Sequence, residues 1–171
     1  MRLELETSRL RLQPCRIEDD KRVHALWTNA CVRYFLFDDR LISLDEARSF
    51  IERSLAHFAQ HGYGLWLVLA CDTNQLVGFA GFLRLEAEKP CLIYEIHPDF
   101  WGCGYATEAA GAVLSYAFEG LALPQVKADV DEPNVASVRV LEKLGMRRTG
   151  RAVVQGRPLL YFEKSHSRGV V

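Results

Sequence analysis

Two glycines that flank a cysteine, Gly102 and Gly104, follow an apolar segment that ends at Pro98. Glycine lets the backbone adopt positive φ and approach a ligand closely. Small and apolar residues then recur with helical spacing from Ala106 to Leu121. The spacing predicts a loop that leads into a helix N-terminus, whose free N–H groups and dipole favour a phosphate or pyrophosphate.

The loop does not match the common nucleotide-binding motifs. It lacks the Gly-Lys-Ser/Thr ending of a triphosphate loop and the three-glycine spacing of a dinucleotide fingerprint. On this segment alone, a plain strand-to-helix turn remains an alternative to an anion site.

The flanking residues resemble a known family. The run WGCGYATEA at 101–109 is similar to the acyl-coenzyme A pyrophosphate loop of the GNAT N-acetyltransferase superfamily, written Gln/Arg-x-x-Gly-x-Gly/Ala. Trp101 replaces the usual Gln or Arg, as in the branch that resembles ribosomal-protein alanine N-acetyltransferases. Three further segments resemble that branch in the same order: ETSRLRLQP (6–14), QLVGFAGF (75–82) and PNVASVRVLEKLGM (133–146).

The resemblance implies an α/β fold with a mixed, mostly antiparallel central sheet of about seven strands flanked by four helices. It implies one N-acetyltransferase domain over residues 7–165, followed by a frayed tail at 166–171. It also implies acetyl-CoA or coenzyme A as co-substrate and no metal. The coenzyme contacts that it implies are Ile96, His97, Trp101, Gly102, Cys103, Gly104, Tyr105, Ala106, Thr107 and Asn134.

Apolar patterns and turn residues predict the elements that position this loop. We expect a first strand ended by Pro14 and a helix that begins at Ser43 or Asp45 and stops before Gly62. The expected helices are 18–29, 44–60 and 135–144, besides the one after the loop, and the later strands are 65–71, 76–85, 92–96, 126–130, 147–154 and 158–163.

Composition excludes several classes of protein. With 171 residues and 49% hydrophobic residues, one domain with a proper core is expected. The 21 basic and 22 acidic residues form no long block, so nucleic acid is not expected as the main partner. No apolar run is long enough to span a bilayer, and Arg2, Glu4 and Glu6 stand where a signal peptide would be apolar.

The cysteines and histidines predict a cytoplasmic protein without a metal site. The five cysteines are scattered and odd in number, which favours a reducing compartment over a disulfide framework or a zinc site. His57 and His61 have the i, i+4 spacing of metal ligands, but no acidic or cysteine partner is evident. We interpret them as surface histidines.

Asn134 and Ser137 open the last expected helix. Asn134 precedes an apolar helical pattern, which predicts an N-cap, and Gly145 stands where a C-cap needs positive φ. The resemblance adds that such an asparagine contacts the pantetheine arm, and both roles are compatible. It also makes Ser137 the candidate acid for the leaving thiolate. A serine is a poor acid, so hydrogen bonding to the sulfur or relay through water are alternatives.

Acyl transfer to an amine needs a neutral amine, donors for the developing oxyanion and a held thioester. Glu95 interrupts the apolar strand LIYEI, and alternation places it on the face of Ile93, opposite Tyr94. Desolvation there raises a carboxyl pKa toward neutrality, which suits a base acting directly or through water. The alternative is an outward-facing glutamate on a sheet edge. The first helical turn and its dipole account for Glu108 without a catalytic role.

Other reactive groups near the loop have weaker assignments. The resemblance points to the Ile96 N–H as the oxyanion donor. His97 would titrate in a useful range, but a structural loop histidine is the favoured interpretation. A covalent intermediate on Cys103 is disfavoured, because the sequence shows no basic partner that would lower its pKa.

Two functions from different classes remain. The first is an N-acetyltransferase that moves an acetyl group from acetyl-CoA to a primary amine by direct transfer in a ternary complex. The second is a catalytically silent acyl-CoA-binding domain that acts through partner contacts. The acceptor, a protein N-terminus or a small molecule, is not identified. The segment YFLFDDR at 34–40 is either its aromatic and acidic cleft or simply core and turn, and a homodimer is possible.

Overall fold

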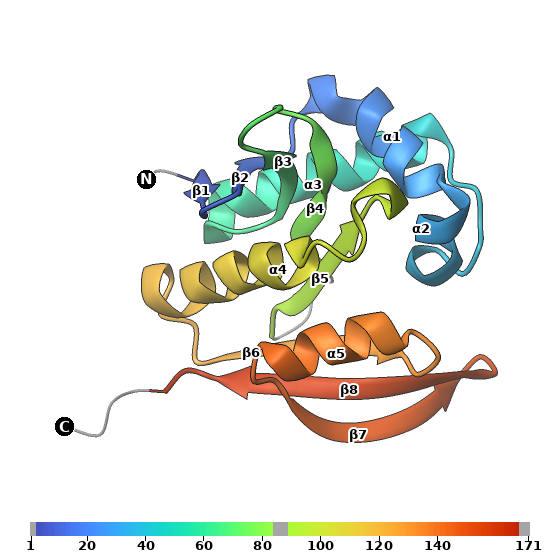
Figure 1. Cartoon of the computed structure of the whole chain (residues 1–171), viewed down its shortest axis with the longest axis vertical. Helices are drawn as coiled ribbons and strands as arrows, with labels where there is room; N and C mark the ends of the chain where they lie inside the picture. Colours follow the sequence, from blue (N-terminus) through green and yellow to red (C-terminus); the bar gives the residue numbers. More distant parts are fainter. Residues whose placement is uncertain (1–2, 84–88, 168–171) are drawn as a thin grey trace.

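An eight-stranded sheet forms the centre of the computed structural model, which describes residues 3–83 and 89–167 (Figure 1). Its strand order is β1-β2-β3-β4-β5-β6-β8-β7. The strands are β1 (Leu5–Glu6), β2 (Leu10–Pro14), β3 (Leu65–Ala70), β4 (Leu76–Leu83), β5 (Cys91–Ile96), β6 (Gln125–Asp131), β7 (Arg147–Val154) and β8 (Arg157–Ser165). All neighbours are antiparallel except β5 and β6, so the mixed, mostly antiparallel sheet is confirmed.

Five α-helices accompany the sheet in the described chain. They are α1 (Asp20–Thr28), α2 (Ala30–Leu36), α3 (Leu44–His61), α4 (Tyr105–Ser115) and α5 (Val135–Lys143). Single turns η1 (Ile17–Asp19) and η2 (Pro98–Phe100) precede α1 and the loop, and the π-helical turn η3 (Tyr116–Gly120) extends α4. Helix α2 was not expected from the sequence. Its N-cap is Asn29, whose side chain accepts a hydrogen bond from the Cys31 N–H.

Local sequence explains where the predicted helices begin and end. In α3 the Ser43 side chain accepts a hydrogen bond from the Glu46 N–H at 3.1 Å, and Gly62 closes the helix with φ of 78°. In α5 the Asn134 side chain accepts from the Ser137 N–H at 3.2 Å, and Gly145 follows with φ of 73°. The predicted caps are therefore confirmed.

Helices cover both faces of the sheet (Figure 1). The fully buried strand β3 alternates between two cores. Leu65 and Leu67 pack against α1 and α3, whereas Trp66 and Val68 belong to the core that includes α4 and α5. The apolar run LWLVLA is therefore explained by burial on both sides.

Strands β5 and β6 diverge along most of their length. They pair at a single register position, Cys91 with Lys127, in parallel orientation. On the other side of β5, pairing with β4 is continuous from Gly78–Ile96 to Leu83–Cys91. That contact is so close that a Cβ at Gly78 would overlap the Glu95 carbonyl oxygen. The sheet is thus held tightly on one side of β5 and opens on the other.

Some expectations need correction. His57 is not a surface residue, because it is 8% exposed and its Nδ1 lies 3.1 Å from the Tyr63 carbonyl oxygen. At the first residue of the expected tail, the His166 N–H donates a hydrogen bond to the Pro124 carbonyl oxygen at 3.0 Å. Residues 84–85 of the expected hairpin and 168–171 of the expected tail lie outside the described residues.

None of the helices in the described ranges is long and apolar enough to cross a membrane.

Ser54 on α3 gives a test of how the helix is joined to the sheet. Its hydroxyl is fully buried and accepts a hydrogen bond from the Leu65 N–H at 2.7 Å. We expect Ser54→Ala to lower the free energy of unfolding by about 1–3 kcal/mol, because the buried N–H loses its acceptor. Urea unfolding measures the change. The exposed Ser115→Ala is the control and should stay within about 0.5 kcal/mol.

Candidate active site

The glycine loop has the conformation that the sequence predicts. Gly102 and Gly104 have φ of 77° and 79°, and Gly104 is the N-cap residue of α4. Apart from Gly102 itself and its two neighbours in the chain, no residue has a heavy atom within 4 Å of a Cβ built there, so conformation and not crowding requires glycine. The loop therefore presents backbone to open space at the positive end of a helix.

Glu108 ties this loop to the first long strand. Its carboxylate accepts hydrogen bonds from the Thr7 hydroxyl at 2.6 Å, the Arg9 N–H at 3.0 Å and Arg9 Nε at 2.7 Å. Arg9 Nη1 donates to the Cys103 carbonyl at 2.8 Å, and the guanidinium lies 4.7 Å from the Tyr105 ring centroid. Glu108 thus holds an arginine beside the glycine loop, a role beyond its interaction with the helix dipole.

Hydrogen bonding dominates the ionisation of Glu108. Burial alone raises the pKa of this carboxyl, but the bonds from Thr7 and Arg9 outweigh burial and hold the pKa below its ordinary value. The group is therefore a carboxylate at neutral pH and a structural one.

A cavity of about 600 Å³ opens beside the loop. Of the residues expected to contact a coenzyme, it is lined by Ile96, Trp101, Gly102, Gly104, Tyr105, Ala106, Thr107 and Asn134. Trp101 is 55% exposed, and its Nε1 donates to the Ile96 carbonyl at 2.8 Å. His97 and Cys103 do not line this cavity. His97 Nδ1 accepts a hydrogen bond from the Asp99 N–H, as expected of a histidine with a structural role in the loop. The Cys103 thiol is exposed and lies beside the Trp101 carbonyl.

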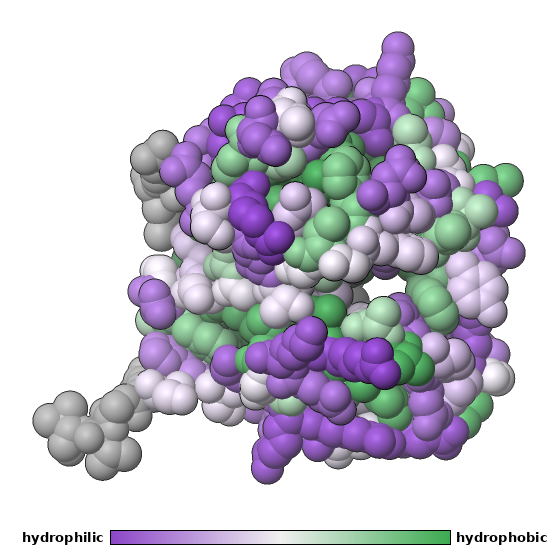
Figure 2. All heavy atoms as spheres, viewed as in Figure 1, coloured by the Kyte–Doolittle hydropathy of each residue, from purple (hydrophilic) through white to green (hydrophobic). Residues whose placement is uncertain are grey.

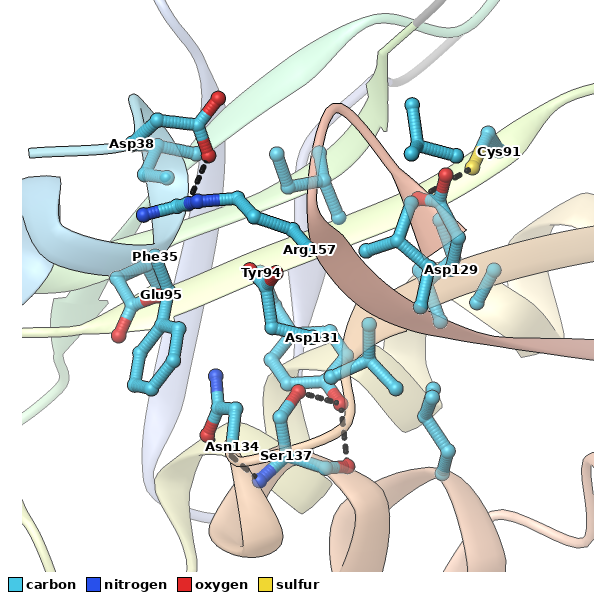
Figure 3. A pocket seen from close by; sticks show the side chains of 18 of the residues that line it. Phe35, Asp38, Cys91, Tyr94, Glu95, Asp129, Asp131, Asn134, Ser137 and Arg157 are labelled. Atoms are coloured by element: carbon cyan, nitrogen blue, oxygen red, sulfur yellow. Dashed lines mark hydrogen bonds and ion pairs between the residues drawn. The ribbon is translucent and has the colours of Figure 1, made fainter. Parts of the chain in front are cut away.

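A second cavity, of about 380 Å³, adjoins the first through the gap between β5 and β6. Five residues line both cavities: Phe35, Tyr94, Glu95, Asn134 and Ser137. Figure 3 shows these side chains converging from α2, β5 and the start of α5. In Figure 2 an opening passes through the molecule between α2 and the start of α5. The two candidate catalytic residues, Glu95 and Ser137, therefore lie where the cavities meet.

Glu95 has the environment of a candidate base. It lies on the same face of β5 as Ile93, which packs with α1 and α3, whereas Tyr94 packs with the opposite core. Burial raises the pKa of the Glu95 carboxyl to about 8, against a smaller opposing effect of a hydrogen bond from the Ile96 backbone. This side chain can therefore accept and release a proton near neutral pH.

Tyr94 and Ser137 form a hydrogen-bonded pair on the other side of the gap. The Tyr94 hydroxyl lies 2.9 Å from Ser137 Oγ and 3.0 Å from the Ser137 carbonyl oxygen. Asn134 fixes the same turn by accepting from the Ser137 N–H. The serine hydroxyl is thus held by one strand and one helix cap.

The second cavity carries an excess of acidic groups. Asp38 pairs with Arg157, while Asp129 and Asp131 on β6 line the same space (Figure 3). Burial raises the pKa of Asp131, Arg157 lowers it, and Asp38 and Asp129 raise it further. Three aspartate carboxyl groups, in addition to that of Glu95, thus line this cavity together with one guanidinium.

The segment 34–40 divides between the two roles considered for it. Phe35 and Asp38 line the second cavity, as an acceptor cleft would require. Phe37 packs against Trp27 in the core, and Asp39 pairs with Arg33 in a turn. Tyr34 is 52% exposed and lines neither cavity.

Sequence reasoning missed several residues that shape the site. Arg9 is 99 residues from Glu108, and no local pattern reveals such a pairing. Arg157 likewise joins a hairpin to a distant loop. The position of Tyr94 could have been predicted. Side chains alternate between the two faces of a strand, so the residue next to Glu95 lies on the opposite face. In the part of the chain that the structure describes, no three His, Cys, Asp or Glu side chains are grouped to hold a metal ion.

The opened sheet and the glycine loop at a helix N-terminus are the features expected of an acetyltransferase fold, and comparisons with known proteins agree. A family model described as an acetyltransferase (GNAT) domain matches residues 9–147, so the chain belongs to the GNAT acetyltransferase family. The uncharacterized N-acetyltransferase YoaA of Bacillus subtilis is 32% identical over 148 residues, which cover 85% of this chain and 84% of the relative. The resemblance found in the loop is thereby confirmed.

Two further proteins are more distant. Spermidine N(1)-acetyltransferase of Escherichia coli is 24% identical over 143 residues, which cover 82% of this chain and 74% of that protein. The structure of RimL, a ribosomal L7/L12 alpha-N-protein acetyltransferase in complex with coenzyme A, matches with a TM-score of 0.79 at 17% identity. That match covers 95% of this chain and 97% of RimL, and it establishes the shared fold.

The link between Glu108 and Arg9 is testable through stability. We expect Glu108→Gln to lower the free energy of unfolding by about 1 kcal/mol, at the low end for charged hydrogen bonds because Arg9 is 47% exposed. The folded-state pKa of Glu108 is lowered, so its contribution is complete above the unfolded value of 4.5 and is lost as the pH falls below it.

Denaturant unfolding between pH 3 and pH 7 checks both points. The difference in the free energy of unfolding between wild type and Glu108→Gln should become smaller as the pH falls toward 3. The exposed Glu52→Gln is the matched control and should show no such difference. A gap that stays constant down to pH 3 would contradict the assignment.

Proposed function

We propose that this protein transfers an acetyl group from acetyl-CoA to a primary amine, directly within a ternary complex. The observation that carries this proposal is the meeting of two cavities at Glu95 and Ser137. One cavity adjoins the glycine loop and the other does not, so donor and acceptor can approach one point from separate sides.

The donor side fits a coenzyme with a diphosphate. The loop supplies backbone N–H groups at a helix N-terminus, and the guanidinium of Arg9, paired with Glu108, lies next to it. Asn134 lines the same cavity farther in and would contact the pantetheine arm. The coenzyme complex of RimL, which shares the fold, supports this assignment.

Glu95 is the proposed base for the transfer. In its ionised form it accepts the proton that the amine nitrogen loses as the N–C bond forms and the C–S bond breaks. The electron pair of the broken bond stays on sulfur, beside Ser137. The Ile96 N–H, which hydrogen-bonds to Glu95 in the protein without substrates, is the proposed donor to the acetyl oxygen once the substrates are bound.

The alternative of a silent binding domain is less well supported. A binding domain has no need of a carboxyl group with a pKa of about 8 at the junction of two cavities. A covalent intermediate on Cys103 is also less well supported, because Cys103 does not line the cavity next to Glu95.

The acidic second cavity favours an acceptor that carries more than one positive charge. Asp129 and Asp131 lie with the Asp38–Arg157 pair, so the lining is net negative. A second ammonium group on the acceptor would be attracted there, and a carboxylate would be repelled. The relative named for spermidine acetylation is in keeping with such an acceptor.

Release of thiol from acetyl-CoA in the presence of an amine tests the proposed reaction. We expect kcat/KM to rise with pH toward about 8 as Glu95 ionises. Glu95→Gln should lower the rate by about 100-fold or more and keep only the pH dependence of the amine itself. Glu142→Gln, an exposed change on α5, should behave as wild type.

Thermal unfolding separates binding from catalysis in the same proteins. Coenzyme A at 100 times its Kd should stabilise wild type and Glu95→Gln alike, by about 2.7 kcal/mol. Binding without thiol release in any amine mixture would support the silent domain. Absence of binding would remove both functions.

Acceptor preference tests the charge of the second cavity. We expect diamines and polyamines to give kcat/KM at least about tenfold above monoamines of equal length, because each extra ammonium meets net negative charge. Asp131→Asn should reduce that preference by about three- to tenfold without changing KM for acetyl-CoA. Equal rates for monoamines and diamines would show that the acidic lining does not select the acceptor.

A further inference from the structure

We propose that Tyr94 is a positioning residue that directs the Ser137 hydroxyl toward the sulfur of bound coenzyme A. This inference rests on the proposed function and adds to it a residue outside the coenzyme loop and helix α5. Tyr94 lies on β5, next to Glu95 in sequence but on the opposite face of the strand.

The contact between strand and helix is specific. The Tyr94 hydroxyl is 2.9 Å from Ser137 Oγ and 3.0 Å from the Ser137 carbonyl oxygen, and Figure 3 shows both contacts on one serine. Asn134 holds the Ser137 N–H at 3.2 Å. Because backbone and side chain of the serine are both held, its hydroxyl has few orientations open to it.

Counting protons gives two arrangements of this pair. In the first, Tyr94 donates to the Ser137 carbonyl and Ser137 Oγ donates to Tyr94, so the serine proton is occupied. In the second, Tyr94 donates to Ser137 Oγ, and the serine proton is available to a third group. A sulfur anion in the shared part of the cavities would favour the second arrangement, because a charged acceptor forms the stronger hydrogen bond.

Tyr94 is suited to donate and not to lose its proton. Burial raises its pKa above the ordinary value; the bond with Ser137 lowers it, and the charge of Glu95 raises it. The phenol therefore stays neutral while it orients the serine. The sulfur anion is stabilised by a hydrogen bond and takes its proton from solvent as coenzyme A leaves.

The charged groups around the pair explain why a hydrogen-bond donor to the sulfur anion is needed. The groups that line the two cavities around this pair are Glu95 on β5, Asp129 and Asp131 on β6, Lys143 on α5, and the Asp38–Arg157 pair. Carboxyl groups outnumber cations among them, so they disfavour a new anion at sulfur. Neutral hydroxyl donors lower its free energy without adding charge.

Binding of coenzyme A and of desulfo-coenzyme A between pH 6.5 and 9 tests the proposal without turnover. The measurements are made in Glu95→Gln protein, so that titration of Glu95 does not overlap with that of the thiol. We expect coenzyme A to gain about tenfold in affinity over desulfo-coenzyme A as the pH rises, which corresponds to a bound thiol pKa lowered by about one unit. When Tyr94→Phe is combined with Glu95→Gln, the rise in affinity for coenzyme A relative to desulfo-coenzyme A should be threefold or less.

Ser137→Ala should remove the same gain, and combining it with Tyr94→Phe should remove no more, since the two act as a unit. Tyr116→Phe is the matched control. The Tyr116 hydroxyl donates a hydrogen bond to the Gly62 carbonyl at 2.8 Å, and Tyr116 lines neither of the two cavities. In protein with Glu95 intact, Tyr94→Phe should lower kcat about tenfold and leave KM for acetyl-CoA within twofold.

Each other outcome has a definite meaning. An unchanged gain in Tyr94→Phe, in protein that binds coenzyme A and melts as wild type, would falsify the positioning role. If Tyr94→Phe does not fold, an unchanged gain in Ser137→Ala overturns it equally. Failure of the unsubstituted protein to bind either ligand would overturn the proposed function itself, and this inference with it.

Discussion

The single pairing of β5 with β6, between Cys91 and Lys127, is the constraint on which the site depends. Parallel strands that continued side by side would satisfy each other's backbone and close the sheet. Here β5 is fixed by β4 on one side, while β6 follows β8 in continuous register on the other. The divergence leaves a gap beside β5, whose residues Tyr94 and Glu95 line both cavities.

The parts that border the gap are joined by contacts between residues far apart in sequence. Glu108 and Arg9 fasten the start of α4 to β2, Tyr94 and Ser137 fasten β5 to α5, and Asp38 pairs with Arg157 across the second cavity. Polar contacts between side chains therefore connect the elements around the gap. Their geometry positions the groups that act on substrates in the proposed reaction.

Features that depend on residues close together in the sequence were predicted well. The caps at Ser43 and Asn134, the glycine loop and the alternation that sends Glu95 away from Tyr94 all depend on neighbours within a few residues. Helix α2 was missed because its seven residues, ACVRYFL, are too short and too apolar to show a period. The long-range pairs could not be predicted, since nothing in the residues around Arg9 indicates that its partner is Glu108.

The two cavities have separate linings, with the loop residues Gly102 and Gly104 on one and Arg157 and Asp38 on the other. They share five residues, among them the proposed catalytic pair Glu95 and Ser137. In an enzyme built this way, neither substrate lies in the path of the other, and coenzyme A can depart while the acetylated product is still held. In the proposed reaction, the geometry therefore imposes no order in which the two substrates bind or the two products leave. The relative affinities of the ligands set that order.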